Sequence, residues 1–366
     1  MTRNTTTKQN MINYLLQTYK FYITLILGTL LLSNSAMIYA KENTRSVNIL
    51  SWWGYLEDPQ VITEITNRCN VNVSSDVFYT NNEFLRRIKT NKADYDIIIL
   101  SDTVYRAIKN DLPKIKTNLS GISDKFHPVI RQKYLASHFP NNVIYFVHSI
   151  SGFLWNPELI DLSEKDQIRT IFKKSKNNIV VLVNDPIEIW NLINKANDQN
   201  NTPWLKKYDE TLPLSMENFL NVVQNKNVYL TNNYNQTYDQ PNFAFSFGWI
   251  GDAITYMNQS HKKYKFLLHP DLSYISADLL VAMNDRPETI CIATSLMSKK
   301  ILNKIGEKAY YFSPYGDYTA INSPEFQNIY QDIFKKLPYL PWLESVSAHD
   351  YAKIEEAWNQ IEINLH

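Results

Sequence analysis

Three aromatic side chains follow the apolar run VNIL (47–50), at the place where a buried strand would end. They are Trp52, Trp53 and Tyr55, with Gly54 among them. Neighbouring side chains of a strand point to opposite faces, so at most one of the two tryptophans can face the same core. A strand that only had to bury itself would not need both, so one tryptophan is available for another role.

Three carboxylates stand at positions where a charge needs a partner. Asp185-Pro186-Ile187-Glu188 can begin a helix as a capping box, with Asp185 as the cap. A capping carboxylate uses one oxygen on the backbone and can offer the other outward, so capping and ligand binding are compatible. Asp278 precedes the apolar run LLVAM, where a charge is costly unless a ligand amine or a neighbouring Arg or Lys meets it.

Trp249 ends the segment FAFSFGWIG (243–251) and has two interpretations. A period of two places it on one strand face with Phe243, Phe245 and Phe247, which favours a core role. Its position immediately before Gly251-Asp252, at the end of the strand, favours a place at the edge of a site. We interpret Trp249 as functional.

The segments that position these residues alternate between strand and helix patterns. The predicted strands cover 47–50, 71–78, 95–100, 143–156, 178–184, 243–251 and 275–283. Predicted helices begin at Asp58-Pro59, residue 82, Ser101-Asp102, Asn156-Pro157, Asp185-Pro186, residue 288 and Ser323-Pro324, and the one from 288 runs to about 305. Short joints between them predict an α/β protein with parallel sheets covered by helices. Ligands of such sheets lie beyond the carboxyl ends of the strands, the edge that Trp52, Trp53 and Ser101 share.

The composition excludes several classes of function. Among 366 residues only 8 are glycine, and no glycine-rich phosphate-binding motif is present. Without residues 1–40, which hold three basic and no acidic residues, 34 Lys and Arg face 36 Asp and Glu, a net charge of −2. A near-neutral chain without basic runs has no footprint for nucleic acid. Cys69 and Cys291 are the two cysteines; export would permit a disulfide, but we expect two separate buried thiols, and no metal site.

The N-terminus has the pattern of an export signal. Arg3, Lys8 and Lys20 precede the apolar stretch FYITLILGTLLL (21–32), and small and polar residues lead to Ala40. We expect cleavage near Ala40 and a periplasmic location. The alternative is a retained membrane anchor, since 21–40 is about long enough to span a bilayer.

Several motifs in order resemble the polyamine-binding proteins of ABC importers. These motifs are "SWWGY", "YDIIILSD", "YFVHSISGFLWNPEL", "VLVNDPIEIW", "GWIGDA" and "SADLLVAM", spread over about residues 46–345. The resemblance implies a two-lobe periplasmic binding protein of type II, each lobe a mainly parallel sheet flanked by helices, with the ligand cleft at the hinge. The first lobe would comprise 46–153 plus 278–322, and the second 154–277 plus 323–366.

The resemblance also implies a function and a set of ligand-binding residues. The chain would capture putrescine or spermidine, pass it to a membrane permease, and act as a monomer without enzymatic activity or cofactor. Aromatic faces would hold the methylenes and attract the amines, by about 0.5–2 kcal/mol each. The expected contacts are Trp52, Trp53, Tyr55, Ser101, Asp185, Glu188, Trp249 and Asp278.

Four positions depart from the family pattern and leave the substrate open. Gly54 stands where an acid or a serine is common, Thr103 where a tyrosine is expected, and Ser276 and His148 where tryptophans are expected. A rival within the class binds ferric ion through tyrosines such as those of AYYFSPYGDY (309–318), which we otherwise expect on the surface of a hinge loop. A rival from another class is a secreted hydrolase that uses Asp185 and Glu188.

Overall fold

The computed structural model describes residues 45–197, 219–223, 226–231, 238–260, 263–316, 324–343 and 346–365. The predicted signal segment, residues 1–40, lies outside these ranges. None of the helices described is long and apolar enough to cross a membrane.

Nine strands of the described chain form one mixed sheet. They are β1 (Ser46–Trp52), β2 (Asn72–Phe78), β3 (Ile97–Ser101), β4 (Val143–Trp155), β5 (Ile179–Leu182), β6 (Asn227–Leu230), β7 (Phe243–Trp249), β8 (Lys265–Leu267) and β9 (Tyr274–Ala282). The strand order is β2-β1-β3-β9-β4-β7-β5-β6, and β8 pairs with β4 beside this path. The pairs β1/β3, β5/β6 and β5/β7 are parallel, whereas β9 and β4 run antiparallel to their neighbours.

Helices follow the strands as the alternating sequence predicts, with one exception. The helix expected from Asn156-Pro157 is not formed, because residues 157–159 make a turn and the next helix begins at Ile168. The helices are α2 (Pro59–Cys69), α3 (Asn81–Asn91), α4 (Asp102–Ile108), α5 (Pro128–Ala136), α6 (Ile168–Ser175), α7 (Pro186–Asn197), α10 (Ile250–Gln259), α11 (Pro287–Leu296), α12 (Lys299–Ala309), α13 (Pro324–Lys336) and α14 (Ala348–Leu365), with short 3₁₀ turns at Lys92–Asp94, Lys109–Asp111 and Ser120–Lys125. The predicted cap of α2 is confirmed, because the Asp58 side chain accepts a hydrogen bond from the Gln60 amide.

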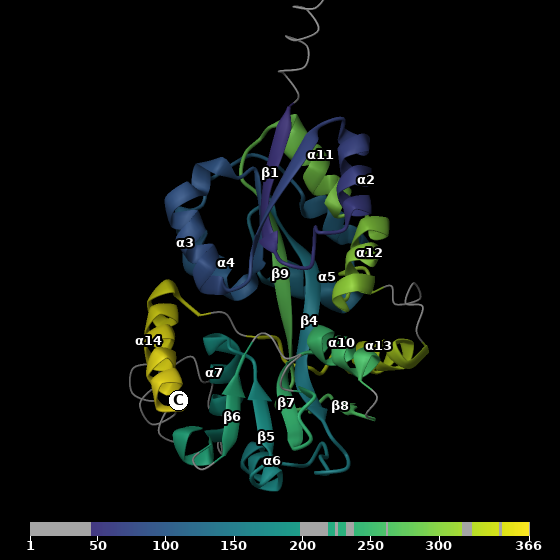
Figure 1. The fold of residues 1–366 in the computed structure, drawn as a ribbon. Coiled ribbons are helices and arrows are strands. Elements are labelled where there is room, and N and C mark those ends of the chain that lie inside the picture. The colour runs from purple at the N-terminus through teal and green to yellow at the C-terminus, as the bar shows by residue number, and fades with distance from the viewer. Residues whose placement is uncertain are drawn as a thin grey trace, which may run out of the picture. The chain divides into compact units, whose positions relative to one another are not determined.

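Two long strands, β4 and β9, connect two hydrophobic cores (Figure 1). Residues 143–150 of β4 lie in one core with β1, β3 and most of β9, and residues 153–155 lie in the other with β5 and β7. All 13 residues of β4 are buried, as a strand that is covered on both faces must be. The predicted two-lobe α/β architecture is therefore confirmed.

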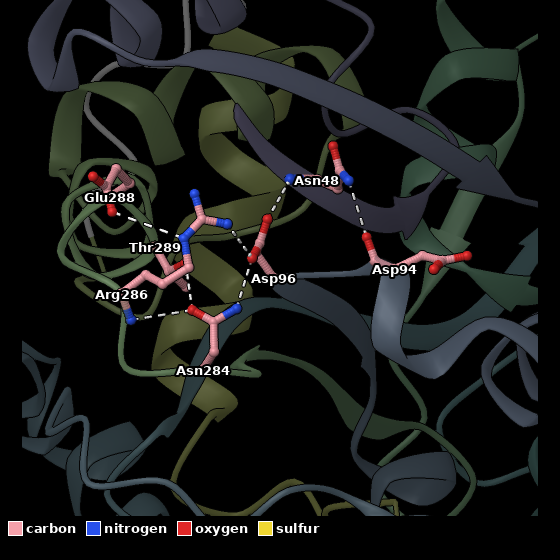
Figure 2. Close-up of polar contacts among 7 residues, drawn as sticks. All are labelled: Asn48, Asp94, Asp96, Asn284, Arg286, Glu288 and Thr289. Atoms are coloured by element: carbon pink, nitrogen blue, oxygen red, sulfur yellow. Dashed lines mark hydrogen bonds and ion pairs between the residues drawn. The ribbon is translucent and has the colours of Figure 1, made fainter. Parts of the chain in front are cut away.

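A polar cluster connects the start of β1, the start of β3 and the end of β9 (Figure 2). Asp96, directly before β3, accepts hydrogen bonds from the Asn48 amide of β1 at 2.9 Å and from the Asn284 side chain after β9 at 2.6 Å. Arg286 adds an ion pair with Asp96 at 3.0 Å. The register of β1, β3 and β9 is thereby set, and with it the positions of the residues at their opposite ends.

Two predictions about α11 and its surroundings are wrong. The helix expected from 288 to about 305 is two helices, because the chain turns at Met297-Ser298 and Ser298 begins α12. Cys69 and Cys291 are not separate thiols but form a disulfide that joins α2 to α11, with the Cα atoms 5.8 Å apart. Cys69 and Cys291 are 222 residues apart in the sequence, and no local sequence pattern indicates a contact over that separation.

Candidate functional site

One wall of the candidate site begins where β1 ends. Trp52 is half-buried and packs on Phe78 of β2, with ring centroids 4.5 Å apart. The chain then turns at Gly54, whose φ of +98° is a left-handed conformation that side chains other than glycine rarely adopt. This turn explains why glycine replaces the acid or serine expected at that position. It also brings Tyr55 back into the core as a buried residue.

Tyr55 is in direct contact with Asp278. Its hydroxyl donates a hydrogen bond to Asp278 Oδ2. Asp278 lies on β9 opposite Ser101 of β3, so the strand register places these two residues side by side. Burial by the surrounding protein raises the pKa of Asp278 to about 7, although the residue keeps some solvent exposure.

The second wall is built around the start of α7. Asp185 caps the helix, because its Oδ1 accepts hydrogen bonds from the amides of Ile187 and Glu188 at 2.9 and 3.0 Å. Its other oxygen, which we expected to face outward, accepts a hydrogen bond from the Asn81 side chain of α3 at 2.9 Å. Burial raises the pKa of Asp185.

The Glu188 carboxylate accepts hydrogen bonds from two side chains. Ser151 of β4 donates to Oε2 at 2.7 Å, and the indole Nε1 of Trp249 donates to Oε1 at 2.9 Å. Burial and the nearby Asp185 charge raise the pKa of Glu188 to about 7. Trp249, half-buried at the end of β7, in turn meets Trp52 edge-on at 6.5 Å. Trp249 thus contacts residues from both walls.

Seven of the eight predicted residues belong to this one chain of contacts. Ser101 completes it, since its hydroxyl donates to Asn81 Oδ1 at 3.4 Å and lies 3.1 Å from the hydroxyl of Thr103. Trp53 is the exception. Its side chain is 61% exposed and stacks on Tyr79, which is 57% exposed, at a centroid distance of 6.3 Å.

The sequence did not single out Asp252 and Tyr311, which lie at the same place. Burial raises the pKa of Asp252, in the first turn of α10, to about 7, and no described residue forms an ion pair or hydrogen bond with its carboxylate. Tyr311 was expected on the surface of a hinge loop but is half-buried, with its ring 6.1 Å from that of Tyr55. The charges of Asp252, Asp278 and Glu188 all act on Tyr311 and contribute to its raised pKa, behind burial.

A signal for these two residues was present in the motif Gly251-Asp252. A Cβ atom on Gly251 would lie 2.4 Å from the Ala309 carbonyl oxygen and 2.8 Å from the Tyr311 ring. Glycine is therefore needed for the close approach of α10 to residues 309–311. That approach brings Asp252 and Tyr311 together.

His148 is buried rather than part of a cleft. It lies in β4 with neither ring nitrogen hydrogen-bonded, stacked on Phe312 at 5.4 Å, and burial lowers its pKa to about 3. Among the described residues, no group of three or more His, Cys, Asp and Glu side chains could hold a metal ion.

The site as a whole is acidic and aromatic. Asp185, Glu188, Asp252 and Asp278 all have a raised pKa, and no Lys, Arg or His of the described chain forms an ion pair with any of them. Buried carboxylates of this kind are stabilised in their charged form by a cation. The arrangement is therefore suited to bind a positively charged group beside Trp52 and Trp249.

Comparisons with known proteins identify the fold. No protein-family model and no curated protein matches the chain. Among solved structures, it is similar to a spermidine/putrescine ABC transporter substrate-binding protein of Streptococcus pneumoniae, with a TM-score of 0.67 and 16% identity over 88% of this chain and 100% of that chain. A putative spermidine/putrescine ABC transporter protein of Listeria monocytogenes gives a TM-score of 0.71 and 14% identity over 87% and 99% of the two chains.

An iron-bound protein of Pseudomonas aeruginosa is also similar, with a TM-score of 0.60 and 11% identity over 88% of this chain and 99% of that chain. These identities show the fold alone. The predicted two-lobe fold is thus confirmed.

Proposed function

We propose that this chain is the solute-binding component of an ABC importer and captures a polyamine such as putrescine or spermidine. The observation that carries the proposal is the set of four carboxylates without a cationic partner in the described chain, Asp185, Glu188, Asp252 and Asp278. Trp52 and Trp249 lie beside them.

The chemistry of a polyamine matches this combination. Each protonated amine pairs with a carboxylate, and the methylenes between amines lie on aromatic faces, which also attract the charge. An ammonium group within hydrogen-bonding distance favours the ionised carboxylate and reverses the effect of burial on its pKa. Exclusion of water on closure around the ligand strengthens each of these pairs.

The rest of the proposal concerns the whole protein. The lobes comprise 46–153 plus 278–322 and 154–277 plus 323–366, and they close on the ligand at the hinge formed by β4 and β9. The chain is exported by residues 1–40, acts in the periplasm as a monomer, and delivers its ligand to a membrane permease. Trp53, exposed beside the site, contacts parts of the ligand that extend outward.

Two rivals are kept as outcomes of the test. Ferric-ion binding gains some support from Tyr55 and Tyr311, whose rings lie 6.1 Å apart beside Asp278. A hydrolase that uses Asp185 and Glu188 gains none. The Glu188 amide donates to the Asp185 carboxylate within one helical turn, whereas glycosidase carboxylates flank a substrate from two sides.

The test is titration calorimetry of the chain without residues 1–40 against putrescine, spermidine, spermine, arginine and Fe(III). We expect saturable binding of a diamine or polyamine; a dissociation constant near 1 μM corresponds to about −8 kcal/mol. Asp161→Asn serves as a matched control for the site variant Asp278→Asn, because Asp161 is exposed and its carboxylate lies outside the site. Tight Fe(III) uptake with a visible tyrosinate band, and no heat with any amine, would overturn the proposal.

A further inference from the structure

A cavity of about 390 Å³ lies outside the acidic site. It is open to solvent and is lined by the end of α4, residues 112–115, the turn after α5 and the start of β4. Val143 and Val281 are buried register partners on β4 and β9 and face it. Tyr105 and Phe139 add aromatic surface. None of the eight predicted ligand-binding residues lines this cavity.

The polar lining of the cavity is basic. Arg106, Lys109, Lys114 and His138 contribute to it, and no Asp or Glu does. Lys109 and Lys114 are exposed, and neither forms an ion pair with any residue that the structure describes. The cavity therefore has the opposite charge character from the acidic site.

Arg106 is held in place by two neighbours. Its Nε donates to Asp102 Oδ1 at 3.0 Å, and the guanidinium lies over the ring of Phe139 at 5.3 Å. Asp102 is itself buried. A guanidinium carries five donors in a fixed planar arrangement, so the bond from Nε leaves the terminal nitrogens for a second acceptor. In the described chain no protein group accepts from them.

The volume of the cavity lies in the range of sites for small molecules, and its lining is about half polar and half apolar. Such sites are concave, of roughly 300–1,000 Å³, mostly apolar, with a few polar groups that fix the orientation of the ligand. Here the apolar part is formed by strand valines and aromatic rings, and the polar part by an anchored arginine and two lysines. Arginine and lysine side chains in such a setting bind carboxylate or phosphate groups.

We propose that this cavity binds a small organic anion, a carboxylate or phosphate carried on an apolar ring. The ring lies against Phe139 and Tyr105, and the anionic group meets Arg106, Lys109 and Lys114. The proposal does not depend on the ligand of the acidic site, because the two sites share no residue that binds.

The test uses phenyl phosphate as the probe, measured by titration calorimetry with the chain lacking residues 1–40. We expect saturable one-to-one binding. Phenol lacks the charge and inorganic phosphate lacks the ring, so each should bind at least tenfold more weakly. The double variant Lys109→Gln/Lys114→Gln should lower the affinity for phenyl phosphate at least tenfold at unchanged Tm, because both side chains are exposed.

The matched control is Lys89→Gln/Lys308→Gln, which removes the same charge from two exposed lysines elsewhere. It should leave phenyl phosphate binding unchanged, and both double variants should keep the affinity for putrescine of the parent chain. An equal loss in the control pair would show a general charge effect and overturn the proposal. So would the absence of saturable binding, or equally tight binding of inorganic phosphate.

Discussion

The carboxylates at the two ends of the acidic site differ in the number of their hydrogen-bond partners. At the α7 end, Glu188 has a donor on each oxygen, Ser151 and Trp249, and Asp185 accepts three hydrogen bonds. At the β9 end, Asp278 has the Tyr55 hydroxyl and the Trp52 side chain, and no described residue meets the carboxylate of Asp252.

This difference indicates which carboxylates help to position the surrounding elements and which serve mainly to bind the ligand. The carboxylates of the α7 end are already stabilised by the protein, so they hold α7, β4 and β7 in place as well as offering charge. Those of the β9 end have fewer partners and depend more on a cation. Substitutions at the β9 end should therefore act on affinity, and substitutions at the α7 end should act on stability as well.

Asp278→Asn should have the largest effect on binding. Removing one partner of a buried charge pair costs about 2–5 kcal/mol, which is at least a thirtyfold loss of affinity for the amine ligand. The Tm of the free protein should not fall, because burial disfavours the charged form of this carboxyl. Calorimetry and thermal unfolding measure both, and a loss of less than threefold would contradict the assignment of the β9 end.

Glu188→Gln should affect stability more than Asp278→Asn does. The amide oxygen would accept from the Trp249 indole, which can only donate, and the NH₂ would donate to Ser151. The Ser151 hydroxyl would then lose its present acceptor, and a buried donor left without an acceptor costs about 1–3 kcal/mol. For a protein of this size, 1 kcal/mol lowers the Tm by roughly 1–2 °C. An unchanged Tm in thermal unfolding would remove the distinction between the two ends.

The affinity for a polyamine should rise with pH between 6 and 8. Glu188, Asp252 and Asp278 have pKa values of about 7 in the free protein, and a bound ammonium lowers them, so binding releases protons. Below pH 7 each group that must lose a proton costs about 1.4 kcal/mol per pH unit. Calorimetry in buffers of different ionisation enthalpy counts the protons released, and an affinity independent of pH would contradict this account.

The same carboxyls make the free protein less stable as pH rises. Their folded pKa values lie above those of an unfolded chain, about 4, so the folded state binds more protons between these values. Stability therefore falls as pH rises toward 8 through the folded pKa values. From pH 6.5 upward the low pKa of His148 opposes this trend little, so thermal unfolding from pH 6.5 to 8 should show a falling Tm.

Asn81→Ala should have the smallest effect. It removes the hydrogen bond from Asn81 to Asp185 and the long one from Ser101 to Asn81, and a hydrogen bond is worth about 0.5–1.5 kcal/mol. We expect a two- to tenfold weaker affinity, mainly through faster dissociation of the amine measured by stopped-flow fluorescence of Trp52 and Trp249. A loss as large as that of Asp278→Asn would mean that Asn81 contacts the ligand.

Most of the fold could be predicted from local patterns, and part of the site could not. Alternation and caps located β1, α2, β7 and the Asp185 helix start, because each depends on neighbouring residues. The Cys69–Cys291 disulfide and the place of Tyr311 depend on contacts between distant segments, which no local pattern encodes. Asn81 was missed for the same reason, since its role appears only when α3 meets α7.

Trp52 and Trp53 show the same division within one dipeptide. Strand alternation correctly implies that they face different ways, and the structure places Trp52 beside Trp249 and Trp53 on exposed Tyr79. Alternation alone could not say which of the two would join the site. That choice is set by the packing of Trp52 on Phe78 of the neighbouring strand.

The most direct test of the central claim is a crystal structure of the chain with putrescine or spermidine bound. The account predicts one ammonium group within about 3 Å of the Asp278 carboxylate, the distance of a charge-assisted hydrogen bond, and the methylenes against Trp52. A second ammonium should lie at the Glu188 end or at Asp252. A polyamine bound elsewhere, with no ammonium group at Asp278, would contradict it.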